Sequence, residues 1–268
     1  MKNVKELKQG IDPRMKRCWG ECCALFFITA GGLTAALFAG YLVMNFLVTM
    51  EIADGMNDPL VIAVVAAIFL IMWVIAVPYQ YGVRWYRLQQ VRGHSVHAKS
   101  VFSCYFSTKR MLQVYKLSVL LFIKRFVLLI PLAVLLSAGI FIIIRINEDG
   151  GSIADNLAVA GLLTLSAVIY LAYTIINIKY AAAPYIFALG HDRPAVEIIK
   201  ESVRFMKDKQ SYMIEMLRSC ALMLIPCILV FPAVFVLPRI MMLYTAAINE
   251  IIENGFAEDR LAVGERRG

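Results

Sequence analysis

The feature that most limits how this chain can fold is a series of apolar segments, each about as long as a lipid bilayer is thick. Four of these segments are residues 22–49, 59–82, 117–144 and 156–178. About 20 consecutive apolar residues in a helix are needed to cross the hydrocarbon core of a membrane. Every segment is long enough, so we predict an all-α fold, a polytopic membrane helix bundle.

The composition agrees with this class. Hydrophobic residues make up 60% of the chain and charged residues 17%, whereas a soluble domain is about half apolar and a quarter charged. The net charge is +8, but the Lys and Arg residues flank the apolar segments, and no nucleic-acid reader motif accompanies them. We therefore expect membrane lipids, and other membrane proteins, as partners and no nucleic acid.

The basic N-terminus followed by an apolar segment also has the outline of a signal peptide. The apolar segment is too long for one, and no convincing cleavage site ends it. Because further apolar segments follow, we expect an uncleaved first transmembrane helix.

The distribution of Lys and Arg predicts which side of the membrane each connection faces. The first 17 residues hold six of them, residues 83–125 nine and residues 179–218 seven, whereas loop 51–58 has none and loop 145–155 has one. Connections rich in Lys and Arg stay on the cytoplasmic side. We predict a multi-pass protein of the cell membrane with a cytoplasmic N-terminus, two basic cytoplasmic segments and two acidic outer loops.

The last apolar stretch, residues 212–252, is long for one span and short for two. Pro226, Pro232 and Pro238 interrupt it, and prolines kink or end helices. The similar sequences VPYQYG, APYIFA and LPRIMMLY indicate a repeat, in which each membrane hairpin precedes a basic cytoplasmic segment. The repeat favours six spans in three hairpins with a cytoplasmic C-terminus, and five spans with an external tail are the alternative.

An amphipathic helix is predicted within the second basic segment. Asp192 is a suitable N-cap and Pro194 lies just inside the helix. Apolar residues then recur every three or four positions, opposite a charged face, as on a helix that lies on the membrane or packs under a bundle. These apolar residues are Val196, Ile199, Val203 and Met206. We treat residues 1–253 as one membrane domain and 254–268 as a flexible tail.

Cationic and aromatic residues at two span ends are the candidate lipid-interface site. Arg84, Trp85 and Arg87 follow the second span, and Lys124 and Arg125 lie near the start of the third. Such residues commonly anchor helices at the membrane surface. A more specific interpretation is a binding site for a lipid headgroup.

Cysteines and histidines offer weaker candidates. Cys18, Cys22 and Cys23 lie before the first span, but a structural zinc site usually has four ligands and no fourth lies nearby. We interpret them as reduced thiols in a reducing compartment. His94 and His97 lack a neighbouring carboxylate that would complete a metal site, so we place them in a solvated loop and expect no metal or cofactor.

The functional prediction is a non-enzymatic membrane protein that organises or binds lipids or partner proteins at the cytoplasmic leaflet. No Asp or Glu lies in the middle of the first four spans, which disfavours an ion-coupled carrier. The sequence contains no phosphate-binding loop or nucleophile motif, so we expect no enzyme. A permease or an accessory subunit of a membrane transporter is the alternative, suggested by the prolines of the last stretch.

The sequence KYAAAPYIFALGHDRPAVEIIKESVRFMKDKQ, which begins at Lys179, resembles a bacterial integral-membrane family, the domain of unknown function 975. The resemblance covers mainly residues 77–110 and 179–253, and the chain departs from it at Arg239, where the family prefers Tyr. It implies about six helices and a bacterial plasma membrane, and it brings no catalytic residues. The residues that carry it are Tyr180, Asp192, Pro194, Ser202, Met206, Lys207, Pro238 and Tyr244.

Overall fold

The computed structural model describes residues 4–50, 58–149, 153–190, 193–224 and 230–265. These residues are helical apart from short connections, and no strand occurs among them, so the predicted all-α class is confirmed. The elements are α1 (Val4–Thr49), α2 (Pro59–Val91), the 3-10 helix η1 (Ala98–Phe106), α3 (Thr108–Asp149), α4 (Ile153–Ile178), α5 (Ala183–Leu189), α6 (Ala195–Met206), α7 (Gln210–Leu224) and α8 (Val230–Glu265).

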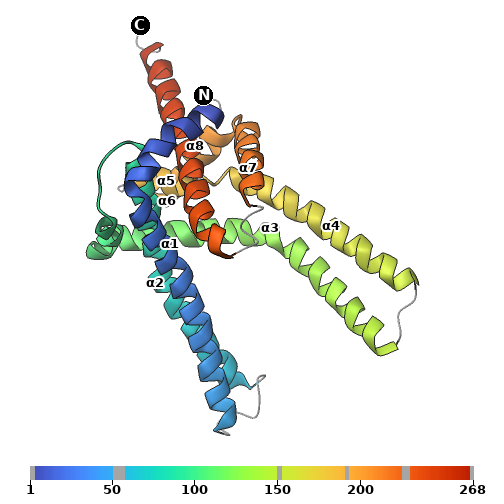
Figure 1. The fold of residues 1–268 in the computed structure, drawn as a ribbon. Helices are drawn as coiled ribbons and strands as arrows, with labels where there is room; N and C mark the ends of the chain where they lie inside the picture. The colour runs from blue at the N-terminus through green and yellow to red at the C-terminus, as the bar shows by residue number, and fades with distance from the viewer. Residues whose placement is uncertain (1–3, 51–57, 150–152, 191–192, 225–229, 266–268) are drawn as a thin grey trace.

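The helices form a head from which two long arms extend in diverging directions (Figure 1). We define the first arm as residues 26–49 of α1 and 59–76 of α2. The second arm comprises residues 126–149 of α3 and 153–177 of α4. The head contains the remaining described residues, including η1, α5, α6 and α7. Both chain ends lie at the head, at the opposite side from the arm tips (Figure 1).

The arms also differ from the head in how much of their surface is buried. Within the described part of the arms, only Val61 and Ser166 are buried. The arms instead expose large apolar side chains such as Leu33, Leu70 and Leu171. A water-soluble protein rarely leaves contiguous apolar surface of this kind uncovered, so the arms have the character of lipid-facing helices.

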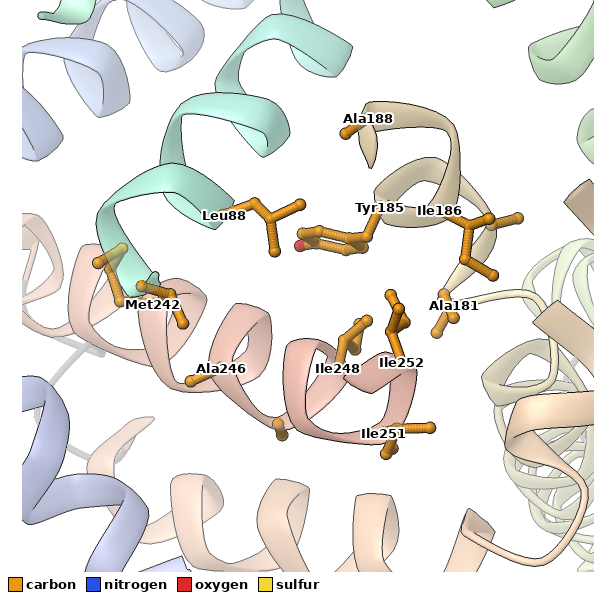
Figure 2. Packing of buried hydrophobic residues seen from close by; sticks show 14 of the residues in the cluster. Leu88, Ala181, Tyr185, Ile186, Ala188, Met242, Ala246, Ile248, Ile251 and Ile252 are labelled. Atoms are coloured by element: carbon orange, nitrogen blue, oxygen red, sulfur yellow. The ribbon is translucent and has the colours of Figure 1, made fainter. Parts of the chain in front are cut away.

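The core of the head is built from one face each of α2, α5 and α8 (Figure 2). Leu88, Tyr185, Ile186 and Ile248 meet there and are almost completely buried. Fully burying an aliphatic side chain of this size contributes about 1.5–3 kcal/mol. The short helix α5 therefore acts as a central wedge that holds α2 and α8 together.

A bend divides α3 between the head and the second arm. Residues Thr108–Val127 and Leu129–Gly139 form two straight parts inclined at 46°. Pro131 lies one turn beyond Val127 in this helix. Proline lacks the N–H that would bond the carbonyl four residues earlier and clashes with it, which explains the bend at this place.

Four helical segments of the described chain are long and apolar enough to cross a membrane, and the bent α3 would make a fifth. The four are Val4–Thr49, Pro59–Val91, Ala158–Leu189 and Val234–Glu258. The molecule thus has the features of a multi-pass membrane protein. The last segment differs from the other three because much of it is buried in the head, including Met242, Ile248 and Ile252.

Two segments of the head differ in detail from the sequence prediction. Helix α6 begins at Ala195 with Pro194 at its N-cap, and Asp192 lies outside the described residues. Val196, predicted on the apolar face, is exposed, whereas Ser202 is buried. Its hydroxyl donates to the Lys179 carbonyl oxygen over 2.9 Å, which ties α6 to the end of α4.

The segment predicted as a tail from residue 254 onward begins as an ordered part of α8. The helix continues to Glu265. A Cβ added at Gly255 would lie 2.5 Å from the ring of Phe205, and the rings of Phe205 and Phe256 stack edge to face with centroids 5.1 Å apart. The end of α8 therefore packs against α6.

Candidate lipid-headgroup site

Three of the predicted interface cations come together where the second arm leaves the head. Arg84 and Arg87 lie one turn apart on α2, and Arg125 lies on α3 just before its bend. The guanidinium groups of Arg84 and Arg125 are both within electrostatic reach of the hydroxyls of Tyr81 and Tyr244. The carbon of the Arg84 guanidinium lies 5.4 Å from the centroid of the Tyr81 ring. Cations from two helices thus share one aromatic surrounding.

Tyrosines from three helices form the wall beside these arginines. The Tyr185 hydroxyl of α5 lies 3.2 Å from Oγ1 of Thr245 in α8, and Arg87 is within electrostatic reach of Tyr185. The ring of Tyr81 meets that of Phe187 edge to face, with centroids 5.7 Å apart. Hydroxyl groups can donate hydrogen bonds to an anion, so this wall adds neutral donors to the three cations.

The three arginines lack acidic partners. Among the described residues, no carboxylate lies within ion-pair distance of Arg84, Arg87 or Arg125. Nε of Arg125 is buried and has no hydrogen-bond partner there. Leaving such a buried donor unsatisfied costs about 1–3 kcal/mol. The cluster is therefore an uncompensated positive site.

Four other cations of the head differ from the three arginines because they have acidic partners. The guanidinium of Arg239 lies 2.7 Å from the Asp12 carboxylate, and that of Arg193 bonds both carboxylate oxygens of Glu201 at 2.8 Å. Arg92 also pairs with Glu253, and Lys209 with Glu258. Among the described residues, these four cations have acidic partners, whereas the arginines near the bend have no carboxylate within ion-pair distance.

The other two predicted interface residues lie differently. Lys124 is exposed at the same bend, and its Nζ lies 5.8 Å from the centroid of the Tyr180 ring at the end of the second arm. Trp85 is half-buried and packs against the core of the head. Arg84, Lys124 and Arg125 therefore lie toward the bend of α3, and Arg87 follows one turn further along α2, close enough to act electrostatically on Arg84.

The tyrosines were not among the predicted site residues. Tyr81, Tyr185 and Tyr244 each belong to one of the three repeated sequences, VPYQYG, APYIFA and LPRIMMLY. The sequence analysis used those repeats only to count spans. The repeats were the signal that these segments have related places in the fold, and in the structure they surround one site.

The thiols do not form a metal site in the described part of the chain. Sγ of Cys18 and Sγ of Cys22 are 3.8 Å apart, and no group of three or more His, Cys, Asp or Glu residues is placed to hold a metal ion. The five cysteines that the structure describes are free thiols. In η1, burial raises the pKa of the Cys104 thiol, which makes it less nucleophilic near neutral pH.

The histidines have a neighbour that their sequence context did not reveal. His94 and His97 are both exposed, and Nδ1 of His97 lies 3.9 Å from a carboxylate oxygen of Glu21 on α1. The same carboxylate accepts a hydrogen bond from the Tyr86 hydroxyl. Glu21 is therefore a carboxylate close to the histidines in space, although it is far from them in the sequence. Its hydrogen bond with Tyr86 links α1 to α2.

The larger cavities lie elsewhere in the head and carry mixed charge. One of about 650 Å³ between α1, α2 and α8 is lined by Arg14, Arg92 and His94 together with Glu250 and Glu253. Because opposite charges alternate around it, this cavity does not select a ligand of either sign. The arginines near the bend of α3, in contrast, have no carboxylate of the described chain within ion-pair distance.

Comparisons with protein-family models, with curated proteins and with solved structures find no match for this chain. The resemblance to the domain of unknown function 975 therefore stays a prediction from the sequence.

Proposed function

We propose that this chain is a non-enzymatic, multi-pass protein of the cell membrane whose cationic head binds anionic lipids at the cytoplasmic leaflet. One observation carries the proposal. Residues 26–76 and 126–177, which include both arms, contain a single Lys or Arg, Arg145, whereas the chain has 27 such residues in all. Positive charge held at one end of exposed apolar helices is the arrangement expected of a head at the inner membrane surface.

The lengths of the arms support membrane insertion. At 1.5 Å per residue, residues 26–49 extend about 36 Å, which is more than the hydrocarbon thickness of about 30 Å. The α3 part of the second arm, residues 126–149, is equally long. The two arms then supply four spans, and α7 with the start of α8 forms a third hairpin, which gives six. Five spans remain the alternative if this last hairpin does not cross.

The orientation is tested by labelling intact cells with a thiol reagent that cannot cross lipid. We expect Ala53→Cys, in the acidic loop, to be labelled, and Ser95→Cys, in the exposed head connection, to be labelled only after the cells are opened. The unmodified chain supplies the baseline, because its described cysteines all lie in the head. Labelling of Ser95→Cys in unbroken cells would place the head outside and end the proposal.

Lipid binding is tested with the full chain in nanodiscs or mild detergent. We expect anionic phospholipid to be retained over phosphatidylcholine, because Lys and Arg near the membrane surface each contribute about 1 kcal/mol with anionic lipid. Raising the salt concentration from about 0.15 M to about 1 M shortens the Debye length from about 8 Å to about 3 Å, so retention should fall. Equal retention of neutral and anionic lipid, unchanged by salt, would contradict the proposal.

Membership of the bacterial family that the chain resembles is a further proposal. A permease is the second candidate function, after the lipid-binding protein. A permease needs a substrate cavity within the membrane. The cavity described above lies in the head, beside the N-terminal part of α1 and the C-terminal part of α2. Uptake of a solute by proteoliposomes that contain this chain alone would favour the permease over the lipid-binding protein.

A further inference from the structure

We propose that Arg84, Arg87 and Arg125 form a site for a phosphate group with two or more negative charges, as in a phosphomonoester or diphosphate lipid headgroup. The proposal rests on the lipid-binding function above and adds the class of headgroup. A phosphodiester headgroup with one negative charge should bind less tightly. The ligand class follows from the charge of the cluster, the number of its donors and its place beside the second arm.

The charge of the cluster sets the charge of its ligand. Arg84 and Arg87 are close enough to act electrostatically on one another, and Arg125 shares the tyrosines that surround Arg84. Arginine stays protonated in proteins. Partly buried cations without acidic partners repel one another and lose hydration. A single negative charge would compensate one of the three, whereas a phosphomonoester or diphosphate compensates two or more.

The number of donors and their origin on different helices favour a phosphate, with its several oxygens, over a carboxylate with two. Arg84 and Arg87 lie on α2 and Arg125 on α3, and the hydroxyls of Tyr81 on α2 and Tyr244 on α8 are within electrostatic reach of Arg84 and Arg125. Guanidinium groups bind phosphate oxygens through pairs of parallel hydrogen bonds. Nε of Arg125 is buried and has no partner in the described chain, so a phosphate oxygen that reached it through a local shift of the side chain would satisfy an otherwise unpaired donor.

The position of the cluster favours a lipid as the source of the phosphate. Immediately after Arg125, the bend of α3 begins the second arm, and Phe126 and Val127 expose 51% and 59% of their surface. A headgroup at Arg125 can therefore lay its acyl chains along the exposed apolar side of the arm. Lys124, exposed at the same bend, adds a cation at the mouth of the site.

The test measures binding of five probes to the full-length protein in nanodiscs or mild detergent: phosphatidic acid, phosphatidylglycerol, glycerol 3-phosphate, inorganic phosphate and, as the neutral reference, phosphatidylcholine. We expect phosphatidic acid to bind roughly tenfold or more tightly than phosphatidylglycerol. Arg84→Gln, Arg87→Gln and Arg125→Gln should each weaken phosphatidic acid roughly tenfold, since each removes a charge-assisted contact. Arg17→Gln, at an exposed arginine on α1, is the matched control and should leave the preference for phosphatidic acid over phosphatidylglycerol unchanged.

Thermal unfolding separates a binding role from a structural one. Phosphatidic acid should raise the melting temperature of the unmodified chain and not that of Arg125→Gln. Without lipid, Arg125→Gln should melt at the same or a higher temperature, because it removes an uncompensated charge. Arg125→Lys keeps the positive charge but lacks the paired N–H donors of a guanidinium, so it should bind phosphatidic acid with intermediate affinity. Lower stability of Arg125→Gln without lipid, together with unchanged lipid affinity, would assign the arginine a structural role and overturn the site.

The remaining outcomes distinguish a failure of the headgroup proposal from a failure of the lipid-binding function on which it rests. If phosphatidic acid and phosphatidylglycerol bind equally, and both exceed phosphatidylcholine, the headgroup preference is wrong and the lipid-binding function stands. If inorganic phosphate or glycerol 3-phosphate binds as tightly as phosphatidic acid, the site takes a soluble phosphate and its lipid source is wrong. If no anionic probe binds better than phosphatidylcholine, both proposals fail.

Discussion

Replacing Gly82 with alanine is expected to displace η1 from α2 and to destabilise the head by about 3 kcal/mol or more, at the upper end of the usual cost of overpacking. A Cβ at position 82 would lie 1.9 Å from the carbonyl oxygen of Val101 and 2.8 Å from its carbonyl carbon. Both are backbone atoms, so no side-chain rotation can relieve the overlap. The whole of η1 would have to move, and the buried Val101 with it.

The measurement is thermal or denaturant unfolding of the purified protein in one detergent. Gly31→Ala is the matched control, because a Cβ at Gly31, in the first arm, has no neighbour within 4 Å. Replacing Gly with Ala at an exposed helical position stabilises a helix by up to about 1 kcal/mol. The two variants should therefore shift the melting temperature in opposite directions. A Gly82→Ala protein as stable as Gly31→Ala would show that η1 does not pack on α2.

The contact between Gly82 and η1 could not be predicted from the sequence. The sequence placed Gly82 at the end of a span and η1 in a long basic connection, and nothing in either pattern indicates that they touch. A close approach between a glycine and a backbone carbonyl depends on the path of the connection through space. That path is set by packing of the head, which hydropathy does not report.

The helices themselves were far more predictable, because apolar length is a local property. The predicted second span, residues 59–82, begins at the first residue of α2, and Asp58 caps the helix by accepting from the Leu60 N–H over 2.7 Å. Its end was placed nine residues early. Hydropathy falls after Val83, at Arg84, but α2 continues to Val91 because Tyr86 and Leu88 are buried in the head.

The candidate site was predictable in its residues and not in its arrangement. Cations beside span ends suggested a membrane surface, and on that basis Arg84 and Arg125 were both selected. Their meeting depends on the bend of α3 near Pro131 and on the position of α5 between α2 and α8. These are tertiary features that join segments about forty residues apart in the sequence, so no local pattern contains them.

Replacing Ile248 with alanine is expected to lower the free energy of unfolding by about 2–5 kcal/mol, the usual range for an aliphatic side chain removed from a packed core. Ile248 is completely buried and lies beside Ile252 on the face of α8 that packs toward Tyr185 of α5 (Figure 2). The surrounding helices cannot close the cavity without shifting α5. Unfolding of the purified protein in detergent measures the effect.

Leu33→Ala is the matched control, because it removes an aliphatic side chain from an exposed position in an arm. Leu33 lies in the first arm and exposes 62% of its surface, so its truncation should change stability little while the same detergent covers the arm. Segments Val4–Thr49 and Val234–Glu258 are both apolar enough to cross a membrane, and hydropathy alone cannot distinguish an arm from a core helix. A large loss for Ile248→Ala beside a small one for Leu33→Ala would assign this part of α8 to the head. If both variants lower the free energy of unfolding by the same small amount, this part of α8 faces lipid instead. The fifth apolar stretch would then have to be counted as a membrane span along its whole length.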